Sequence, residues 1–114
     1  FKRGGEKGRA LYEELRDRIQ ALDPNIEIKP TKYYIGFRLG GYNVLAIHIR
    51  KNYIWLDLPR HRPQDLRDPD DRVFYNKTSL KNLNMHLSYF RINEPADVDY
   101  AMSLARQVYE HFTK

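Results

Sequence analysis

Residues 33–58, with the sequence YYIGFRLGGYNVLAIHIRKNYIWLDL, decide the fold of this protein. Along this stretch β-branched and aromatic residues alternate with other residues, which is the period of a half-buried β-strand. The pair Gly40-Gly41 and the pair Lys51-Asn52 interrupt the alternation, and such pairs are typical of hairpin turns. The stretch therefore predicts two consecutive β-hairpins.

A two-residue turn at Lys51-Asn52 would fix which side chains share a face of the second hairpin. In that register three pairs of aliphatic residues oppose one another on one face: Ile49 and Ile54, Ile47 and Leu56, Leu45 and Leu58. The other face then carries a mixed set with two large aromatics: Val44, Ala46, His48, Tyr53, Trp55 and Asp57. To align Phe37 with Leu45 in the first hairpin, the connection at Gly40-Gly41 must have an odd number of loop residues or contain a bulge.

The segments on either side of the hairpins predict two helices. Apolar residues recur at helical spacing across residues 8–22, and they do so again across 95–112, where Pro95 suits a first helical turn. Shorter alternating runs at 26–28 and 85–92 predict further strands. The sequence therefore predicts an α+β fold. It is a two-layer sandwich in which an antiparallel sheet of about five strands carries the N- and C-terminal helices on one face.

Length, charge and composition set the broad class. The 114 residues suffice for one core, and a net charge of +5 favours polyanions without the excess of a DNA-packaging protein. The absence of cysteine excludes disulfides, and no apolar run is long enough for a membrane span or a signal peptide, so we expect a cytoplasmic protein without a membrane partner. Residues 1–8 predict a basic, Gly-rich linker. Residues 9–114 would then form a single domain of a larger chain, with neighbouring domains as partners.

Several runs of residues resemble an uncharacterised prokaryotic domain family. They are LYEEL at 11–15, LDPNI at 22–26, KYYIGF at 32–37, YIWLDL at 53–58 and DVDY at 97–100. Domains of that family occur at the C-termini of predicted transport proteins and of restriction- or nuclease-associated proteins. The resemblance covers nearly the whole chain and follows the pattern least well at 71–84. It implies by analogy a role near nucleic acid in defence, and it brings no catalytic residues.

No constellation in the sequence predicts catalysis. Glu27 and Lys29 have the Glu-x-Lys spacing of a magnesium-dependent nuclease strand, but the nearest upstream acid, Asp23, is too close and belongs to a helix-ending turn. The four histidines show no metal-ligand spacing, and no glycine motif stands before a helix to cradle a phosphate. We therefore expect no metal, no cofactor and no enzymatic activity.

The aromatic and basic face of the sheet remains as the candidate binding surface, together with the long connection 59–82. Residues 29–56 contain five Lys and Arg and no acid, and aromatics set between cations bind single strands by stacking bases and neutralising phosphates. The candidate residues for binding nucleic acid or a partner are Tyr34, Arg38, His48, Tyr53, Trp55, Arg60, His61 and Arg62. We predict a non-catalytic accessory domain that binds nucleic acid or positions a partner nuclease domain. The alternative is a protein-interaction or dimerisation module that uses the same face and makes the protein a homo-oligomer.

Overall fold

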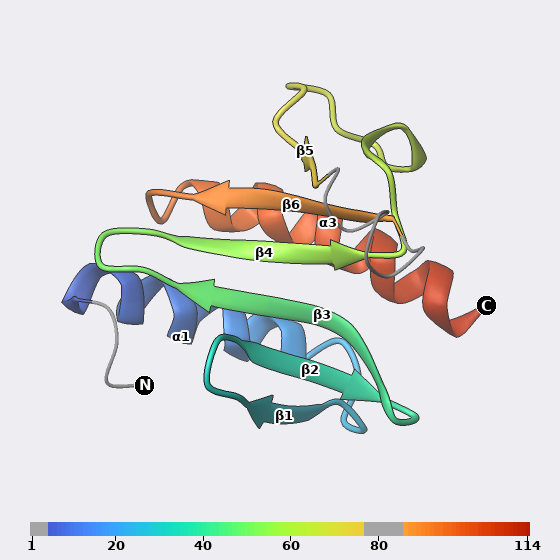
Figure 1. Ribbon diagram of the computed structural model, residues 1–114, viewed down its shortest axis with the longest axis horizontal. Helices are drawn as coiled ribbons and strands as arrows, with labels where there is room; N and C mark the ends of the chain where they lie inside the picture. The colour runs from blue at the N-terminus through green and yellow to red at the C-terminus, as the bar shows by residue number, and fades with distance from the viewer. Residues whose placement is uncertain (1–4, 77–85) are drawn as a thin grey trace.

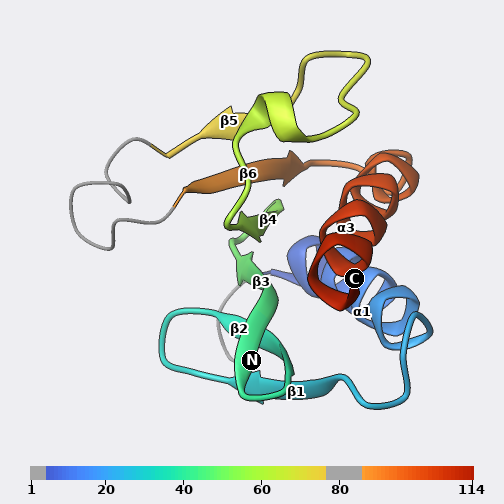
Figure 2. The same cartoon turned by 90° about the vertical axis from the view of Figure 1, so that its right-hand side faces the viewer.

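The computed structural model describes residues 5–76 and 86–114, and within them two helices lie on one face of an antiparallel sheet. The helices are α1 (Glu6–Gln20) and α3 (Asp97–Thr113), and Figure 2 shows both on the same side of the strands. In the described part of the chain no helix covers the opposite face. This arrangement confirms the predicted α+β sandwich. Neither helix is long and apolar enough to cross a membrane.

The sheet has six strands, one more than the predicted number of about five. Their order is β1-β2-β3-β4-β6-β5, and every neighbouring pair is antiparallel (Figure 1). The strands are β1 (Glu27–Pro30), β2 (Ile35–Leu39), β3 (Tyr42–Ile49), β4 (Ile54–Pro59), β5 (Phe74–Tyr75) and β6 (Leu87–Ile92). The additional strand is β5, which lies inside the predicted connection 59–82. Its two residues are too few to give a local pattern, and pairing with β6 is what makes them a strand.

The register of the second hairpin is the predicted one. Ile47 lies opposite Leu56 and Ile49 lies opposite Ile54, so the aliphatic row faces the helices. On the other face His48 lies opposite Trp55. The alternation of side chains along the two strands therefore predicted the pairing of this hairpin correctly.

The first hairpin contains a bulge, which was the second of the two predicted options. The bulge is what aligns Phe37 with Leu45. Phe37 pairs with Leu45, whereas the next residue, Arg38, pairs with Asn43, so Val44 is an extra residue in β3. The turn itself has two residues, and both glycines adopt the left-handed backbone that such a turn requires, with φ of 57° and 84°. Val44 is only 2% exposed and belongs to the core cluster. Its predicted place on the outer face is therefore wrong, because the bulge breaks the alternation there.

The core fills the space between the sheet and the two helices. Ile47, Ile54, Leu56 and Leu58 are fully buried in it, whereas Ile49 at the end of β3 is only partly buried. The helices contribute fully buried side chains to the same cluster: Tyr12, Leu15 and Ile19 from α1, and Val98, Ala101, Leu104 and Ala105 from α3. The aliphatic row thus lies under both helices, as predicted.

Helix α1 begins against the turn between β3 and β4. The N–H of Gly5 donates to the carbonyl of Lys51 at 3.1 Å, and the helix starts at Glu6, two residues before the predicted start. One turn further, a Cβ added to Gly8 would lie 2.2 Å from the carbonyl oxygen of Arg50. Real Cβ atoms do not approach a backbone oxygen so closely, so glycine at position 8 is what lets the helix rest on the turn.

The connection between β4 and β5 is fastened to α3. It contains the short 3-10 helix η1 (Pro63–Asp65). Beyond it, the side-chain amide of Gln107 accepts the N–H of Arg67 at 2.7 Å and donates to the carbonyl of Arg67 at 3.1 Å. Arg72 forms an ion pair with Asp97 at 3.0 Å near the start of α3. Its positive charge is therefore used within the fold.

The carboxylate of Asp68 organises the second half of this connection. It accepts the N–H groups of Arg72 and Val73 at 2.9 Å each, and the hydroxyl of Tyr100 also donates to it. Burial alone would raise the pKa of Asp68, but these three donors outweigh burial and hold the pKa below the ordinary 3.8. Asp68 thus acts as a structural anchor between the connection and α3.

Candidate functional site

Five aromatic rings form a row across the face of the sheet opposite the two helices. One ring comes from, or immediately precedes, each of the five adjacent strands β2, β3, β4, β6 and β5. Tyr34 immediately precedes β2, His48 lies on β3, Trp55 on β4, Tyr89 on β6 and Phe74 on β5. The distances between successive ring centroids are 5.8, 4.7, 6.0 and 5.4 Å in that order. We call this row the aromatic ladder. It runs across the strands rather than along them.

Strand pairing sets the order of the ladder. His48 lies directly opposite Trp55 in the β3–β4 hairpin, and Tyr89 on β6 lies opposite both Asp57 on β4 and Phe74 on β5. Side chains of opposed residues on the same face lie within contact distance, which is why rings from five separate positions meet. The ladder is therefore a product of the sheet and not of one contiguous motif.

Two arginines stack on aromatic rings beside the ladder. The guanidinium of Arg50 lies 4.4 Å from the centre of the Trp55 ring, and that of Arg91 lies 3.7 Å from the centre of the Tyr53 ring. Tyr53 in turn lies 6.4 Å from Trp55, centroid to centroid. Stacking of this kind holds a cation in place and contributes on the order of 0.5–1 kcal/mol at an exposed site. The ladder, Tyr53, Arg50 and Arg91 together are called the aromatic face below.

A hollow of about 570 Å³ opens beside the centre of the ladder. Its lining combines rings, one carboxylate, one amide and one aliphatic side chain: His48, Trp55, Asp57, Tyr75, Asn76, Leu87 and Tyr89. Within it the Nε2 of His48 lies 2.8 Å from Oδ2 of Asp57, and these two side chains are only 17% and 16% exposed. The hollow therefore has aromatic walls and contains the hydrogen-bonded, half-buried pair of His48 and Asp57.

Four of the predicted site residues come together on this face: Tyr34, His48, Tyr53 and Trp55. Arg38 lies next to them but is engaged with the bulge, where it donates to the Asn43 side chain at 3.3 Å and to the carbonyl of Gly41. The amide of Asn43 donates in turn to the hydroxyl of Tyr34 at 3.3 Å. Arg38 therefore supports the end of the ladder through Asn43.

The other three predicted residues, Arg60, His61 and Arg62, are not brought to the aromatic face. Arg60 donates to the Asn43 carbonyl at 2.8 and 3.0 Å and lies over Phe112 of α3. His61 is buried, and Arg62 pairs with Asp65 of η1 at 3.2 Å. Their basic side chains suggested a binding role from the sequence, whereas in the structure these residues hold the connection in place.

The aromatic face also contains residues that the sequence analysis did not select. Tyr89 and Arg91 of β6, Phe74 of β5 and Arg50 after β3 all contribute to it. The alternation in 85–92 was the available signal, since Ser88, Phe90 and Ile92 are buried and the residues between them point to the other face. The sequence did not show that β6 lies beside β4. Without that pairing, the contacts of Tyr89 and Arg91 with aromatic residues of the hairpin could not be predicted.

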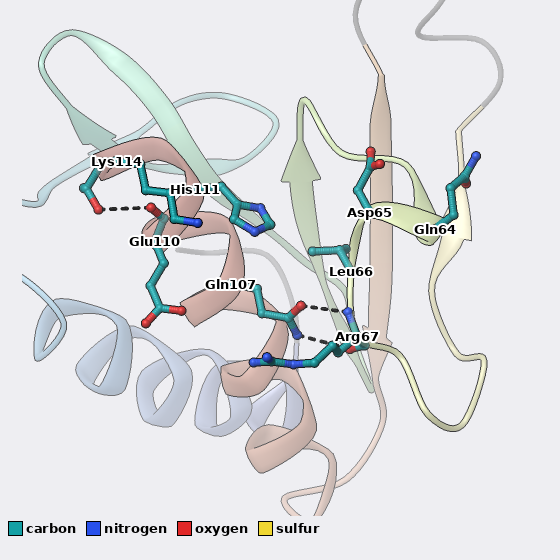
Figure 3. Close-up of a pocket in the computed structure, with 9 residues that line it drawn as sticks. Gln64, Asp65, Leu66, Arg67, Gln107, Glu110, His111 and Lys114 are labelled. Atoms are coloured by element: carbon teal, nitrogen blue, oxygen red, sulfur yellow. Dashed lines mark hydrogen bonds between the residues drawn. The ribbon is translucent and has the colours of Figure 1, made fainter.

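A second hollow, of about 680 Å³, lies between η1 and the end of α3 (Figure 3). The side chain of Gln107 crosses it to reach the backbone of Arg67, so its polar groups already serve the fold. At its rim Nδ1 of His111 lies 2.8 Å from Nε2 of the buried His61. Within the residues that the structure describes, no cluster of three or more His, Cys, Asp or Glu side chains could hold a metal ion.

The comparison with known families matches almost the whole chain. The family described as a domain of unknown function (DUF5655) matches residues 1–111. No match was found among curated proteins or among solved structures. The matched range includes both helices up to the last residues of α3, all six strands and every residue of the aromatic face. The chain therefore belongs to the family of the domain of unknown function DUF5655.

Proposed function

We propose that this domain binds single-stranded nucleic acid on its aromatic face. The observation that carries the proposal is the aromatic ladder itself, in which neighbouring rings lie 4.7 to 6.0 Å apart on a sheet surface over which residues 5–76 and 86–114 place no helix. Aromatic side chains stack on nucleobases of any sequence, and each such contact contributes about 1–3 kcal/mol of binding. A row of rings offers several of these contacts along one path.

The charge around the ladder suits a phosphate backbone. Arg50 and Arg91 stand beside the central rings, and the segment 29–56, which forms much of the sheet, contains no acidic residue. Aromatics interleaved with cations are the common arrangement in proteins that bind single strands, because the rings hold the bases and the cations neutralise the phosphates. The carboxylate of Asp57, beside the centre of the ladder, is paired with His48.

The proposed role is that of a non-catalytic accessory domain. The residue runs that resemble domains of restriction- and nuclease-associated proteins support a place beside a nuclease domain, at the C-terminus of a larger cytoplasmic protein. In that setting a stacking surface would hold a displaced or frayed strand near the partner's active site. The aromatic face of this domain would then give the whole protein its specificity for single strands, and the partner domain would supply catalysis.

The test measures binding of fluorescent single-stranded DNA as the salt concentration rises. We expect affinity to fall steeply with salt, since each neutralised phosphate contributes a slope of about 0.7 in a log–log plot for single strands. Arg50→Ala and Arg91→Ala should each reduce that slope by about 0.7. Arg106→Ala removes the same charge from the exposed face of α3 and should leave the slope unchanged. If neither DNA nor RNA binds at low salt, the proposal is wrong.

One observation favours a second candidate function, self-association through the same face. Phe74 is 54% exposed on β5, the last strand at one edge of the sheet, where an apolar ring could receive another copy. An interface of this kind would hold or tighten as salt rises, in contrast to phosphate binding. Sedimentation of the protein alone over a concentration series, with Phe74→Ser as the comparison, decides whether the dimer forms.

A further inference from the structure

We infer that the hollow beside Trp55 accommodates a guanine base and that Asp57 recognises the hydrogen-bonding edge of that base. The inference rests on the proposed single-strand binding, because the strand would deliver the base to the hollow. It goes beyond that binding by assigning a preference among bases. The starting point is the presence of a carboxylate at the centre of a surface otherwise suited to phosphates.

A carboxylate in this position needs a reason. Its negative charge weakens the attraction of the aromatic face for a phosphate backbone, so a strand-binding surface would do better with a neutral residue there. Pairing with His48 stabilises Asp57, but an asparagine oxygen could accept the same hydrogen bond from Nε2. The negative charge would strengthen hydrogen bonds that a molecule bound in the hollow donates to it.

The Asp57 carboxylate offers an acceptor to the hollow. Its Oδ2 atom lies 2.8 Å from Nε2 of His48, and its Oδ1 atom has no hydrogen-bond partner among the described residues. Oδ1 is not one of the sealed, unpaired side-chain atoms of residues 5–76 and 86–114, so it reaches solvent. A ligand that binds to this oxygen must present a donor.

Among the nucleobases, guanine offers the matching edge. Its Watson–Crick edge presents the N1–H and the N2 amino group side by side, and a carboxylate can accept both. Adenine and cytosine present one amino group next to a ring lone pair, and thymine or uracil presents one imino group between two carbonyl oxygens. Those lone pairs would face the Asp57 carboxylate. The two acceptors repel each other and neither receives a hydrogen bond, which costs binding energy.

The walls of the hollow suit a flat ring. The rings of Trp55 and Tyr89 lie 6.0 Å apart between centroids along one side, and Leu87 adds an apolar contact. The volume of about 570 Å³ is within the range of sites that hold small organic ligands, about 300–1,000 Å³. A base turned off the strand could therefore stack on the ladder and present its edge to Asp57 at the same time.

The experiment compares thymidine oligonucleotides of about twelve residues that differ only in one central base. We expect a central guanine to bind about tenfold more tightly than thymine, adenine or cytosine, because a bidentate contact discriminates on that scale. Deoxyinosine keeps N1–H but lacks the N2 amino group and should lose most of the gain. 7-Deazaguanine keeps both donors and should retain it. Uridine RNA strands with the same replacements show whether the preferred source is DNA or RNA.

Asp57→Asn assigns the preference to the carboxylate. The substituted side chain keeps an oxygen for His48 but places an amide donor in the hollow, so the ratio of affinities for the guanine and the all-thymidine strands should fall to about one. Glu110→Gln, which removes an equal charge from exposed α3, is the matched control and should keep the preference. The guanine–inosine comparison uses the unaltered protein, so it tests the preference for guanine even if Asp57→Asn unfolds.

The outcomes separate this inference from the proposed function. Binding of all strands with equal affinity overturns the guanine assignment and leaves single-strand binding intact. A guanine preference that survives Asp57→Asn in a folded variant overturns the role of Asp57. Absence of binding to every strand overturns the proposed function, and this inference with it.

Discussion

Nε2 of His48 lies 2.8 Å from Oδ2 of Asp57, across the hairpin that joins β3 and β4. The two residues are diagonal neighbours, because His48 pairs with Trp55 and Asp57 pairs with Ala46. The imidazole is thus held at one edge by a carboxylate while its ring lies 4.7 Å from the ring of Trp55. The fold therefore holds the centre of the aromatic ladder in place, which would reduce the entropy lost if a strand binds there as proposed.

Replacing Trp55 with alanine should weaken single-strand binding by about 1–3 kcal/mol, because Trp55 is the ring that joins the ladder to the Tyr53 and Arg91 pair. The side chain is only half-buried, so the loss of stability should be smaller than the roughly 3–5 kcal/mol of a fully buried tryptophan. Fluorescence anisotropy and urea denaturation of the same preparation measure the two quantities.

Tyr42→Ala is the control for this change, since Tyr42 is an exposed aromatic that contacts Phe112 on the helix side of the sheet. It should leave strand binding unaltered. If Trp55→Ala instead lowers stability sharply, and affinity corrected for the folded fraction does not change, then Trp55 is a packing residue and the stacking role fails.

Gly8→Ala should destabilise the protein although alanine is the better helix former by about 1 kcal/mol. The new Cβ would lie 2.2 Å from the carbonyl oxygen of Arg50, so α1 must shift away from the β3–β4 turn, and overpacking of this kind costs about 1–3 kcal/mol. The midpoint of urea denaturation measures the effect. Lys7→Ala, one residue earlier and exposed, should change stability by no more than about 0.5 kcal/mol. A stabilised Gly8→Ala protein would show that the helix does not rest on the turn.

Ile47→Ala should cost about 2–5 kcal/mol of unfolding free energy, because Ile47 is fully buried at the centre of the sheet beneath the helices. Equilibrium denaturation with urea measures the cost, and the slope of the transition should stay constant if only stability changes. Tyr33→Ala, at a position 66% exposed, is the comparison and should be nearly neutral. A loss below about 1 kcal/mol at Ile47 would contradict the register that places it in the core.

Stability should fall in acid through Asp97. Burial alone would raise its pKa, but the N–H groups of Asn93 and Glu94 and the guanidinium of Arg72 lower the pKa below the ordinary 3.8. A carboxyl group whose folded pKa is depressed contributes stability above the unfolded pKa, and that contribution disappears as pH falls below 3.8 through the folded value. Unfolding free energy should therefore drop as the pH is lowered through 3.8 and below it.

Asp97→Asn tests this assignment. At neutral pH the variant should be less stable by about 1–3 kcal/mol, because the charged hydrogen bonds are lost, and its stability should depend less on acid than that of the unaltered protein. Asp17→Asn, on the exposed face of α1, should leave the acid dependence nearly as it was. Equal acid sensitivity in Asp97→Asn and the unaltered protein would remove Asp97 from the account.

The amino-acid sequence by itself determined the two hairpins and, except at the bulge residue Val44, the faces of their strands. Alternation along residues 33–58 and the turn residues at Gly40-Gly41 and Lys51-Asn52 act between neighbours in the chain, so they fix that His48 opposes Trp55 without reference to any distant segment. The helical periods in the flanking segments likewise follow from local spacing, and the predicted helices match α1 and α3 to within two residues at each end. These features required no knowledge of the tertiary fold.

Only the tertiary structure decided how the aromatic face is completed. Tyr89 and Arg91 reach Trp55 and Tyr53 because β6 pairs with β4. Each of these side-chain contacts joins residues more than thirty positions apart, and no local pattern encodes them. The same long-range packing brought Arg60 to the carbonyl of Asn43 and His61 to His111 of α3, whereas Arg62 pairs locally with Asp65. Charge in a sequence shows that a residue needs a partner. Whether that partner is a ligand or the protein's own backbone depends on which distant segments the core brings within hydrogen-bonding distance.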